Sequence, residues 1–338
     1  MKILVIGGSG FLGRPLVHQL ARIGHDVTVL HRGRRDFDLP ARSLIASRVD
    51  LPRLHPRADV VVDLILSSGR QARESMDALR GYVGRVVAAS SMDVYRAAGI
   101  LHGTEDGPAD PPPLTEDSPL RSRLHPYPRE QIRALQSIFG WLDEEYDKIP
   151  VERAVLGDDE LPGTVLRLPM VYGPGDRLRR HYSLLRRMSD GRRKIPIEER
   201  WAAWRAPRGY VENVAAALAL AAVSSVGAGR IYNVAERPAY SEQQWATMLA
   251  TAAKWDGEFV ILPERQMPPH LHRSGNPAQD WDADSSRIRR ELGYVEPIAL
   301  ADALRRTVEW ELANPPAEFD PLQFDYAAED AAFAACSA

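Results

Sequence analysis

The chain has 338 residues, a length that suits two domains or one large α/β domain with a smaller lobe. Hydrophobic residues make up 44% and charged residues 26%, which excludes a disordered or collagen-like chain. The 43 basic and 46 acidic residues give a net charge of −3, so no broad positive field attracts nucleic acid. We therefore expect no DNA binding, and RNA binding is disfavoured.

The only cysteine is Cys336, which excludes an intramolecular disulfide and any cysteine-based metal site. This cysteine usage predicts a reducing, cytoplasmic location. The longest apolar stretch, residues 214–226, is rich in alanine and shorter than the roughly 20 residues needed to cross a bilayer. We expect a buried helix there and no membrane association.

Short β-branched runs alternate with helical segments over residues 1–91. The runs predict strands at 2–6, 26–30, 59–65 and 85–89, and the segments between them predict helices at 14–23 and 70–82. This alternation is typical of a parallel sheet covered by helices. The sequence therefore predicts an α/β fold with a Rossmann-like, doubly wound parallel sheet.

A glycine-rich loop joins the first predicted strand to the first predicted helix. Gly7, Gly10 and Gly13 let the backbone turn tightly and approach a pyrophosphate, and Phe11 and Leu12 lie between them. The helix that follows offers N–H groups and a positive dipole end to the phosphates. The loop therefore predicts a dinucleotide cofactor.

The second predicted strand ends at His31 and Arg32, where an NAD-binding protein would commonly place Asp or Glu. An arginine there can grip a ribose 2′-phosphate by charge-assisted hydrogen bonds. Arg32, Arg34 and Arg35 therefore predict NADP as the preferred cofactor, with NAD as the second choice. The alternative is that these arginines form a solvated basic loop.

Residues 101–128 lose periodicity and contain seven prolines, which predicts a long irregular insertion near a pocket. Order returns with an expected helix at 130–145, a strand at 164–168 and a Gly/Pro turn at 172–175.

A smaller C-terminal α/β substrate lobe is expected to follow. Its predicted helices cover 178–188, 241–253, 285–292 and 300–314, and its predicted strands cover 230–234 and 259–262. We divide the chain into a mainly NAD(P)-binding domain, 1–176, and a mainly substrate-binding lobe, 177–315, with some segments returning to the first sheet. The acidic tail, 316–338, is either disordered or docked.

Three later motifs accompany the glycine loop: Ser90-Ser91-Met92-Asp93-Val94-Tyr95, residues 166–176 with Tyr172-Gly173-Pro174-Gly175, and residues 208–214. With these motifs in this order, the chain resembles the NAD-dependent epimerase/dehydratase family of extended short-chain dehydrogenases/reductases. The resemblance runs from residue 1 to about residue 315. It implies a catalytic set of Ser, Tyr and Lys, in which a tyrosine exchanges a proton with substrate while nicotinamide exchanges a hydride.

Ser91 matches the serine of that set, but no lysine lies four residues after a tyrosine. Lys148 lies at the expected distance before the strand at 164–168, and its partner becomes Tyr146. Because Pro150 favours extended geometry just before it, both side chains can face one side ahead of a helix. In the family, the lysine lowers the pKa of the tyrosine and binds the nicotinamide ribose.

A second register uses Tyr127 with Gln131, which could bind a ribose but could not lower the pKa of a phenol by charge. A third alternative is that neither tyrosine is catalytic. The catalytic residues we expect are Ser91, Tyr146 and Lys148. The cofactor contacts we expect are Gly7, Gly10, Phe11, Leu12, Gly13, His31, Arg32, Asp50 and Lys148.

Arginines at 177, 179, 180, 186, 187 and 208 could contact an anionic, nucleotide-sugar-like substrate, or they could fill the wet face of a helix. His270 and His272 lack a third ligand at diagnostic spacing, so no metal site is expected. Aromatic residues at the spacing of Trp201, Trp204 and Tyr210 more often pack in a hydrophobic core than line a pocket.

The sequence thus favours an NAD(P)-dependent epimerase, dehydratase or carbonyl/alcohol oxidoreductase acting on a small molecule. A non-catalytic dinucleotide-binding redox sensor is the main alternative, and an RNA-binding member of the superfamily is the weaker one. A homodimer is compatible with the sequence.

Overall fold

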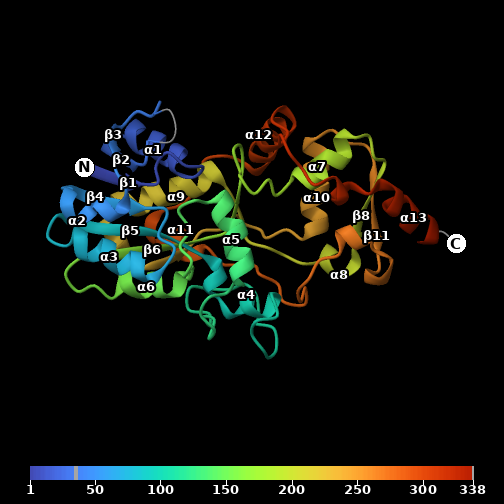
Figure 1. Cartoon of the computed structure of the whole chain (residues 1–338), viewed down its shortest axis with the longest axis horizontal. Coiled ribbons are helices and arrows are strands. Elements are labelled where there is room, and N and C mark those ends of the chain that lie inside the picture. Colours follow the sequence, from blue (N-terminus) through green and yellow to red (C-terminus); the bar gives the residue numbers. More distant parts are fainter. Residues whose placement is uncertain (34–36, 337–338) are drawn as a thin grey trace.

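The computed structural model describes residues 1–33 and 37–336 of the chain. A seven-stranded sheet forms the larger part of the molecule, in the order β10-β6-β5-β4-β1-β2-β3, with every neighbouring pair parallel (Figure 1). The strands are β1 (Lys2–Ile6), β2 (Asp26–His31), β3 (Arg42–Ile45), β4 (Ala58–Asp63), β5 (Val83–Ser91), β6 (Gly163–Leu168) and β10 (Ile231–Asn233). The predicted Rossmann-like α/β fold is confirmed.

Helices cover both faces of this sheet, because its central strands are apolar on both sides. One face packs on α1 (Gly13–Arg22), α9 (Val211–Val223) and α11 (Ser286–Leu292), and the other on α2 (Leu51–Leu54), α3 (Gly69–Leu79) and α6 (Lys148–Leu156). The buried α9 covers most of the alanine-rich segment predicted as a buried helix, but it ends at Val223, three residues before the predicted end. Within residues 1–33 and 37–336, no helix has the length and apolar character to span a membrane.

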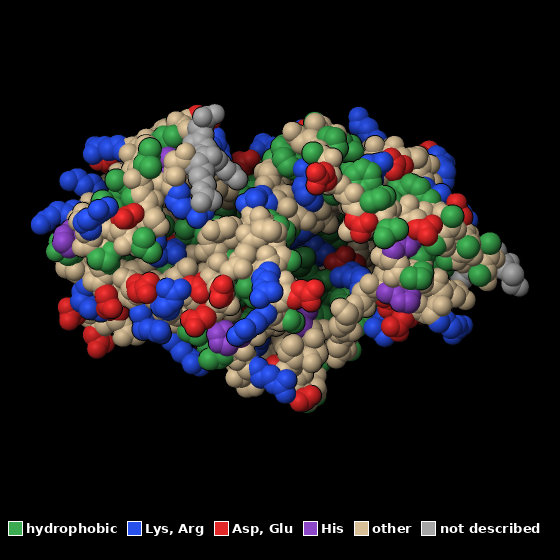
Figure 2. Space-filling model, viewed as in Figure 1, with side chains coloured by type: hydrophobic (Ala, Val, Ile, Leu, Met, Phe, Trp, Pro, Cys, Tyr) green, Lys and Arg blue, Asp and Glu red, His purple; other side chains and the backbone are tan. Residues whose placement is uncertain are grey.

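A smaller lobe stands beside the sheet, on the right of Figure 1. It holds two parallel strand pairs, β8 (Lys194–Glu198) with β11 (Glu258–Leu262) and β7 (Met170–Tyr172) with β9 (Arg208–Tyr210). Its helices are α7 (Tyr182–Ser189), α8 (Glu199–Ala202), α10 (Glu242–Ala252) and α12 (Leu300–Ala313). On the face seen in Figure 2, the surface is hollowed between this lobe and the sheet.

The segment between α4 (Arg96–Leu101) and α5 (Arg129–Ile138) is irregular, as predicted, and a few buried residues anchor it. Leu114 is buried and forms an isolated bridge with Ala283, and Arg121 donates its backbone N–H to the carbonyl of Val94. The insertion is therefore anchored near the end of β5 by these residues, while most of its other residues are exposed or half-buried.

The prediction of one helix over 130–145 is wrong. Helix α5 ends at Ile138, because Phe139 leaves the helical region with φ −115° and ψ 77°, and an irregular connection that contains turns leads to α6 at Lys148. Phe139 and Trp141, which fall within the predicted range, lie in this connection and line a cavity.

The acidic tail is docked. Helix α13 (Tyr326–Cys336) packs on the smaller lobe, with Phe333 against Leu262 and Met267. Glu329 lies 2.7 Å from the guanidinium of Arg187, and both side chains are buried. The sequence left open whether the tail is disordered or docked, and this buried ion pair shows that it is docked.

Candidate active site

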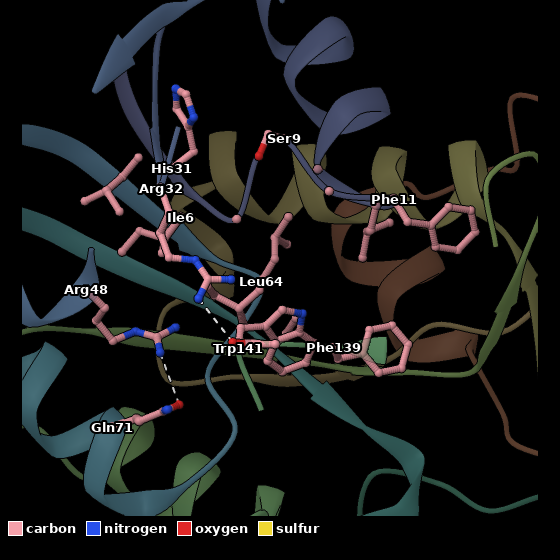
Figure 3. Close-up of a pocket in the computed structure, with 18 of the residues that line it drawn as sticks. Ile6, Ser9, Phe11, His31, Arg32, Arg48, Leu64, Gln71, Phe139 and Trp141 are labelled. Carbon is pink, nitrogen blue, oxygen red and sulfur yellow. Dashed lines mark hydrogen bonds between the residues drawn. The ribbon is translucent and has the colours of Figure 1, made fainter. Parts of the chain in front are cut away.

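A cavity of about 780 Å³ opens at the carboxyl ends of the parallel strands. Binding sites of open α/β sheets lie at this edge. The cavity brings together nearly all the residues selected from the sequence: Gly7, Gly10, Phe11, Leu12, Gly13, His31, Arg32, Ser91, Tyr146 and Lys148. Figure 3 shows Ser9 and Phe11 on the glycine loop facing Phe139 and Trp141 across this space.

The backbone of the glycine loop turns tightly, and its residues approach one another closely. Gly7 has φ +84°, and its carbonyl accepts a 3.1 Å hydrogen bond from the N–H of Gly10. A Cβ on Gly13 would lie 2.4 Å from that carbonyl oxygen and 2.5 Å from the Cα of Gly8. Among the residues that the structure describes, no side chain caps the start of α1. The loop therefore fits the phosphates of a dinucleotide.

The end of β2 presents Arg32 to the cavity. Its guanidinium donates a 3.1 Å hydrogen bond to the carbonyl of Gly140 (Figure 3). His31 is buried, with Nε2 2.7 Å from the hydroxyl of Ser43 and its ring stacked on Phe37. Arg34 and Arg35, which contributed to the NADP prediction, lie outside the described residues.

Arg48 is a lining residue that the sequence reasoning missed. It forms a 2.8 Å ion pair with the buried Asp63 at the end of β4, and it donates to Gln71 (Figure 3). Asp50, expected to contact the cofactor, lies outside the cavity lining. Its carboxylate accepts a hydrogen bond from the N–H of Ser47 and pairs with Arg53. In the sequence, Arg48 lies only two residues before Asp50, the residue expected to contact the cofactor.

Tyr146 and Lys148 stand at the start of α6 and both line the cavity, although Lys148 is the first residue of the helix and does not lie ahead of it as expected. Helix α6 begins at Lys148, and the Asp147 side chain caps it by accepting from the N–H of Ile149. The insertion holds this cap in place, since Asp147 also accepts a 2.7 Å hydrogen bond from the N–H of His125. Pro150 lies in the first turn, where it needs no partner for its nitrogen.

The Lys148 ammonium points to backbone oxygens. It donates to the carbonyls of Ala89, at 3.0 Å, and Leu66. Burial lowers the pKa of Lys148 to about 8, against the opposing effect of Asp93. The lysine is therefore held between β5 and the segment that follows β4, where it lines the cavity.

Tyr146 donates a 2.8 Å hydrogen bond to Oδ2 of Asp93, a residue that sequence reasoning did not select. Burial raises the pKa of Tyr146 well above 10, and the Asp93 carboxylate raises it further. The expectation of a lowered tyrosine pKa is wrong, because Lys148 bonds to carbonyls while a carboxylate faces the phenol. Asp93 lies two residues after Ser91, whose hydroxyl accepts from the N–H of Asp93.

Tyr127, the tyrosine of the second register, also donates to Oδ2 of Asp93, at 3.2 Å. Its ring centroid lies 5.7 Å from that of Tyr146, but Tyr127 does not line the cavity, and Gln131 is exposed. The structure thus places Tyr146 at the cavity and Tyr127 behind it.

Most of the arginines considered for substrate have partners within the protein. Arg177 lines the cavity, 5.8 Å from the ring centroid of Phe139. The others form ion pairs: Arg179 with Glu311, Arg180 with Asp176, Arg186 with Asp190, Arg187 with Glu329 and Arg208 with Glu242. Only Arg177 of this group is therefore available to a ligand in the cavity.

The remaining aromatic and histidine candidates belong to the packing. Trp201, Trp204 and Tyr210 are buried in the smaller lobe. His270 lies 3.2 Å from Glu329, and His272 lies 2.8 Å from the carbonyl of Met267. Throughout the part of the chain that the structure describes, no three His, Cys, Asp or Glu side chains are grouped to hold a metal ion.

Two reductases are similar to this chain in sequence. The chain is 29% identical over 256 residues to a 3-diazoavenalumate denitrifying reductase of a Streptomyces species, with 72% of this chain and 79% of that protein covered. It is 25% identical over 357 residues to 2-alkyl-3-oxoalkanoate reductase of Stenotrophomonas maltophilia (strain K279a), with 90% and 98% covered.

Solved structures share the fold. MoeE5 in complex with UDP-glucuronic acid and NAD has a TM-score of 0.66 at 23% identity. UDP-glucuronic acid 4-epimerase from Bacillus cereus, in complex with UDP-glucuronic acid and NAD, has a TM-score of 0.67 at 16% identity. Each comparison covers 93% of this chain and 99% of the other. The model of the NAD dependent epimerase/dehydratase family matches residues 3–235, more than half of the sequence, and the chain belongs to that family.

Proposed function

We propose that the protein is an NADP-dependent reductase that exchanges a hydride and a proton with the carbonyl or hydroxyl group of a small molecule. The observation that carries this proposal is the shared cavity, in which Ser91, Tyr146 and Lys148 face the same space as the glycine loop and Arg32. Nicotinamide would supply or accept the hydride when bound. The protein would be an atypical extended short-chain dehydrogenase/reductase.

The cofactor-binding roles follow from the residues around the cavity. The loop from Gly7 to Gly13 would hold the pyrophosphate, and Arg32 would grip the 2′-phosphate of NADP. Lys148 would donate to the nicotinamide ribose from its place beside Ala89. Family members are described as NAD-dependent, and the preference for NADP is our inference from Arg32.

The catalytic roles fall to Ser91 and Tyr146. Their hydroxyl groups would orient the substrate oxygen, and Tyr146 would exchange a proton with it. The raised pKa of Tyr146 keeps its phenol protonated at neutral pH, which suits the donation of a proton to a carbonyl oxygen during reduction. Both curated relatives described above are named as reductases, which also supports this direction.

An epimerase or dehydratase is the second candidate. Residues 137–141 line the cavity together with the glycine loop, so a dinucleotide bound there would be covered on two sides. An enzyme that regenerates its cofactor in each turnover would gain from such retention.

The test is to purify the protein, identify any bound nucleotide and measure the affinities for NADP and NAD. Loss of NADPH absorbance is then followed with a 2-alkyl-3-oxoalkanoate, and epimerisation is assayed with UDP-glucuronic acid. We expect exchangeable, tighter binding of NADP and NADPH consumption with the oxo acid. Tightly held NAD with an epimerised sugar would favour the second candidate, and binding of neither nucleotide would overturn both.

A further inference from the structure

Asp93 is a buried carboxyl group with an unusual set of neighbours. It lies in a short turn between Met92 and Val94, and only 3% of its surface is exposed. The hydroxyl groups of Tyr146 and Tyr127 both donate to its Oδ2, at 2.8 and 3.2 Å. Its other oxygen, Oδ1, is buried and has no hydrogen-bond partner among the described residues.

We propose that Asp93 is the proton relay of the site: its carboxyl group exchanges a proton with the phenol oxygen of Tyr146 each time Tyr146 exchanges one with substrate. This inference rests on the proposed function and adds a residue to it. Lys148 does not fill this position, because its ammonium is bonded to the carbonyls of Leu66 and Ala89.

The proton count balances in both directions. In alcohol oxidation, the substrate O–H bond breaks, its proton binds the oxygen of Tyr146, and the phenolic proton of Tyr146 passes to Oδ2 of Asp93. In carbonyl reduction, Asp93 starts as a carboxylic acid, Tyr146 gives its proton to the substrate oxygen, and Asp93 gives its own proton to the phenol oxygen. The dihydronicotinamide cofactor is the reductant in that direction, as the proposed function requires.

The charges around Asp93 allow it to hold a proton. Burial raises the pKa of Asp93, and the nearby charge of Asp147 acts in the same direction. Three effects lower the pKa of Asp93 and so oppose this shift: the charge of Arg121, the hydrogen bond that Tyr146 donates, and the charge of Lys148. The charge of Asp93 also acts on the pKa of His102, at the end of α4, and on that of Tyr127. Because burial is the largest of these effects, the pKa of Asp93 is raised, which favours its acid form relative to that of an exposed carboxyl group.

Tyr127 is the second tyrosine whose hydroxyl group is bonded to Asp93. It is half-buried, whereas Tyr146 is buried at the cavity. The ring of the exposed His102 stands edge-on to Tyr127, with centroids 6.4 Å apart. The carboxyl group therefore lies between a tyrosine that faces the cavity and a tyrosine on the solvent side.

The first experiment tests whether Asp93 holds a proton in the purified protein, without any substrate. Infrared spectra at neutral pH are compared between the wild type and Asp93→Asn, with Asp110→Asn as a matched control. Asp110 is also buried, but it pairs with Arg96 and touches neither tyrosine. We expect a carboxylic acid band that is lost in Asp93→Asn and kept in Asp110→Asn. In Tyr146→Phe the band should shift, since one hydrogen bond to Oδ2 is lost. Absence of the band in the wild type overturns the proposal, and the Tyr146→Phe comparison serves if Asp93→Asn does not fold.

The second experiment measures the pH dependence of kcat for NADPH-dependent reduction of a 2-alkyl-3-oxoalkanoate. In the wild type, kcat should fall as rising pH removes the proton of Asp93. In Asp93→Asn, kcat should drop about 100-fold or more and lose that pH limb, as expected when a general acid path is removed. A purely structural role would leave the limb in place in the variant, and that result would overturn the relay. Failure of the wild type to consume NADPH would instead count against the proposed function, while the infrared band still decides the state of Asp93.

Discussion

The guanidinium of Arg121 lies 3.1 Å from the carboxylate of Asp147, and both side chains are buried almost completely. Asp147 stands between Tyr146 and Lys148 and caps the helix that Lys148 begins. Arg121 belongs to the irregular insertion, which precedes α5 in the chain. The insertion therefore fixes the segment that carries the two candidate catalytic side chains.

Replacing Arg121 with Met should lower the free energy of unfolding by about 3–5 kcal/mol, because the Asp147 carboxylate would stay buried without its cation. Urea unfolding monitored by tryptophan fluorescence measures this loss. Arg123→Met is the matched control: its ion pair with Asp106 is solvent-exposed and 3.9 Å long, so its loss should cost less than about 1 kcal/mol. Equal effects of the two substitutions would contradict the structural role of Arg121.

Gly13→Ala should weaken NADP binding strongly, since the new Cβ would lie 2.4 Å from the Gly7 carbonyl oxygen and would open the cradle. Strain of about 1–3 kcal/mol corresponds to a rise in Kd of roughly five- to 150-fold. Gly10→Ala, with its nearest contact at 3.3 Å, should have a smaller effect. Gly24→Ala tests stability alone, because Gly24 has a positive φ and open space around it. An unchanged Kd in Gly13→Ala would remove the loop from cofactor binding.

Arg32→Asp should reverse the ratio of the NADP and NAD affinities, because a carboxylate repels the 2′-phosphate and accepts from a ribose hydroxyl. Isothermal titration with both nucleotides gives the ratio. Arg22→Asp makes the same change of charge at the far end of α1, outside the cavity lining, and should leave the ratio unchanged. A ratio that Arg32→Asp does not move would show that NADP preference, if measured, comes from other residues.

Lys148 should lose its proton near pH 8 in the protein without cofactor, because burial disfavours its charge. The chain has only four lysines, so ¹³C-lysine NMR can follow each one, and Lys148→Met assigns the signal. The unfolded state would hold this proton up to about pH 10.5, so the stability contributed by this group should rise as pH increases from about 8 to 10.5. Four signals that all titrate near pH 10.5 would contradict the buried position.

Repeating apolar patterns made the central strands of the sheet predictable, whereas the edge strand β3 was not predicted. Strands β1, β2, β4 and β5 are continuous apolar runs because helices cover both of their faces. Strand β3 lies at the end of the sheet and its residues are mostly exposed, so its sequence carries no such run. Arg48, which follows that strand, was missed together with it.

The site was predictable where its residues share a short motif. The glycine loop and the pair Tyr146 and Lys148 could be placed from spacing, since each set is contiguous in the chain. Asp93 was not selected, because its partners Tyr127 and Tyr146 lie 34 and 53 residues away. The docking of the tail was equally hidden, since Arg187 and Glu329 are 142 residues apart. Contacts over such distances are decided by tertiary packing.

The hydrogen bond from Arg32 to the carbonyl of Gly140 changes how cofactor choice is to be understood. A 2′-phosphate that binds Arg32 through the same N–H must displace this carbonyl oxygen. When NADP binds in this way, the guanidinium of Arg32 exchanges the carbonyl oxygen of Gly140 for a phosphate oxygen. The contribution of Arg32 to the preference for NADP over NAD is then the difference in free energy between these two hydrogen bonds. Because Gly140 lies beside Trp141 in the wall of the cavity, the exchange would also release that wall from the end of β2. A nucleotide without the 2′-phosphate would leave the hydrogen bond between Arg32 and Gly140 in place. The two cofactors would then differ in their rates of binding and release as well as in their affinities.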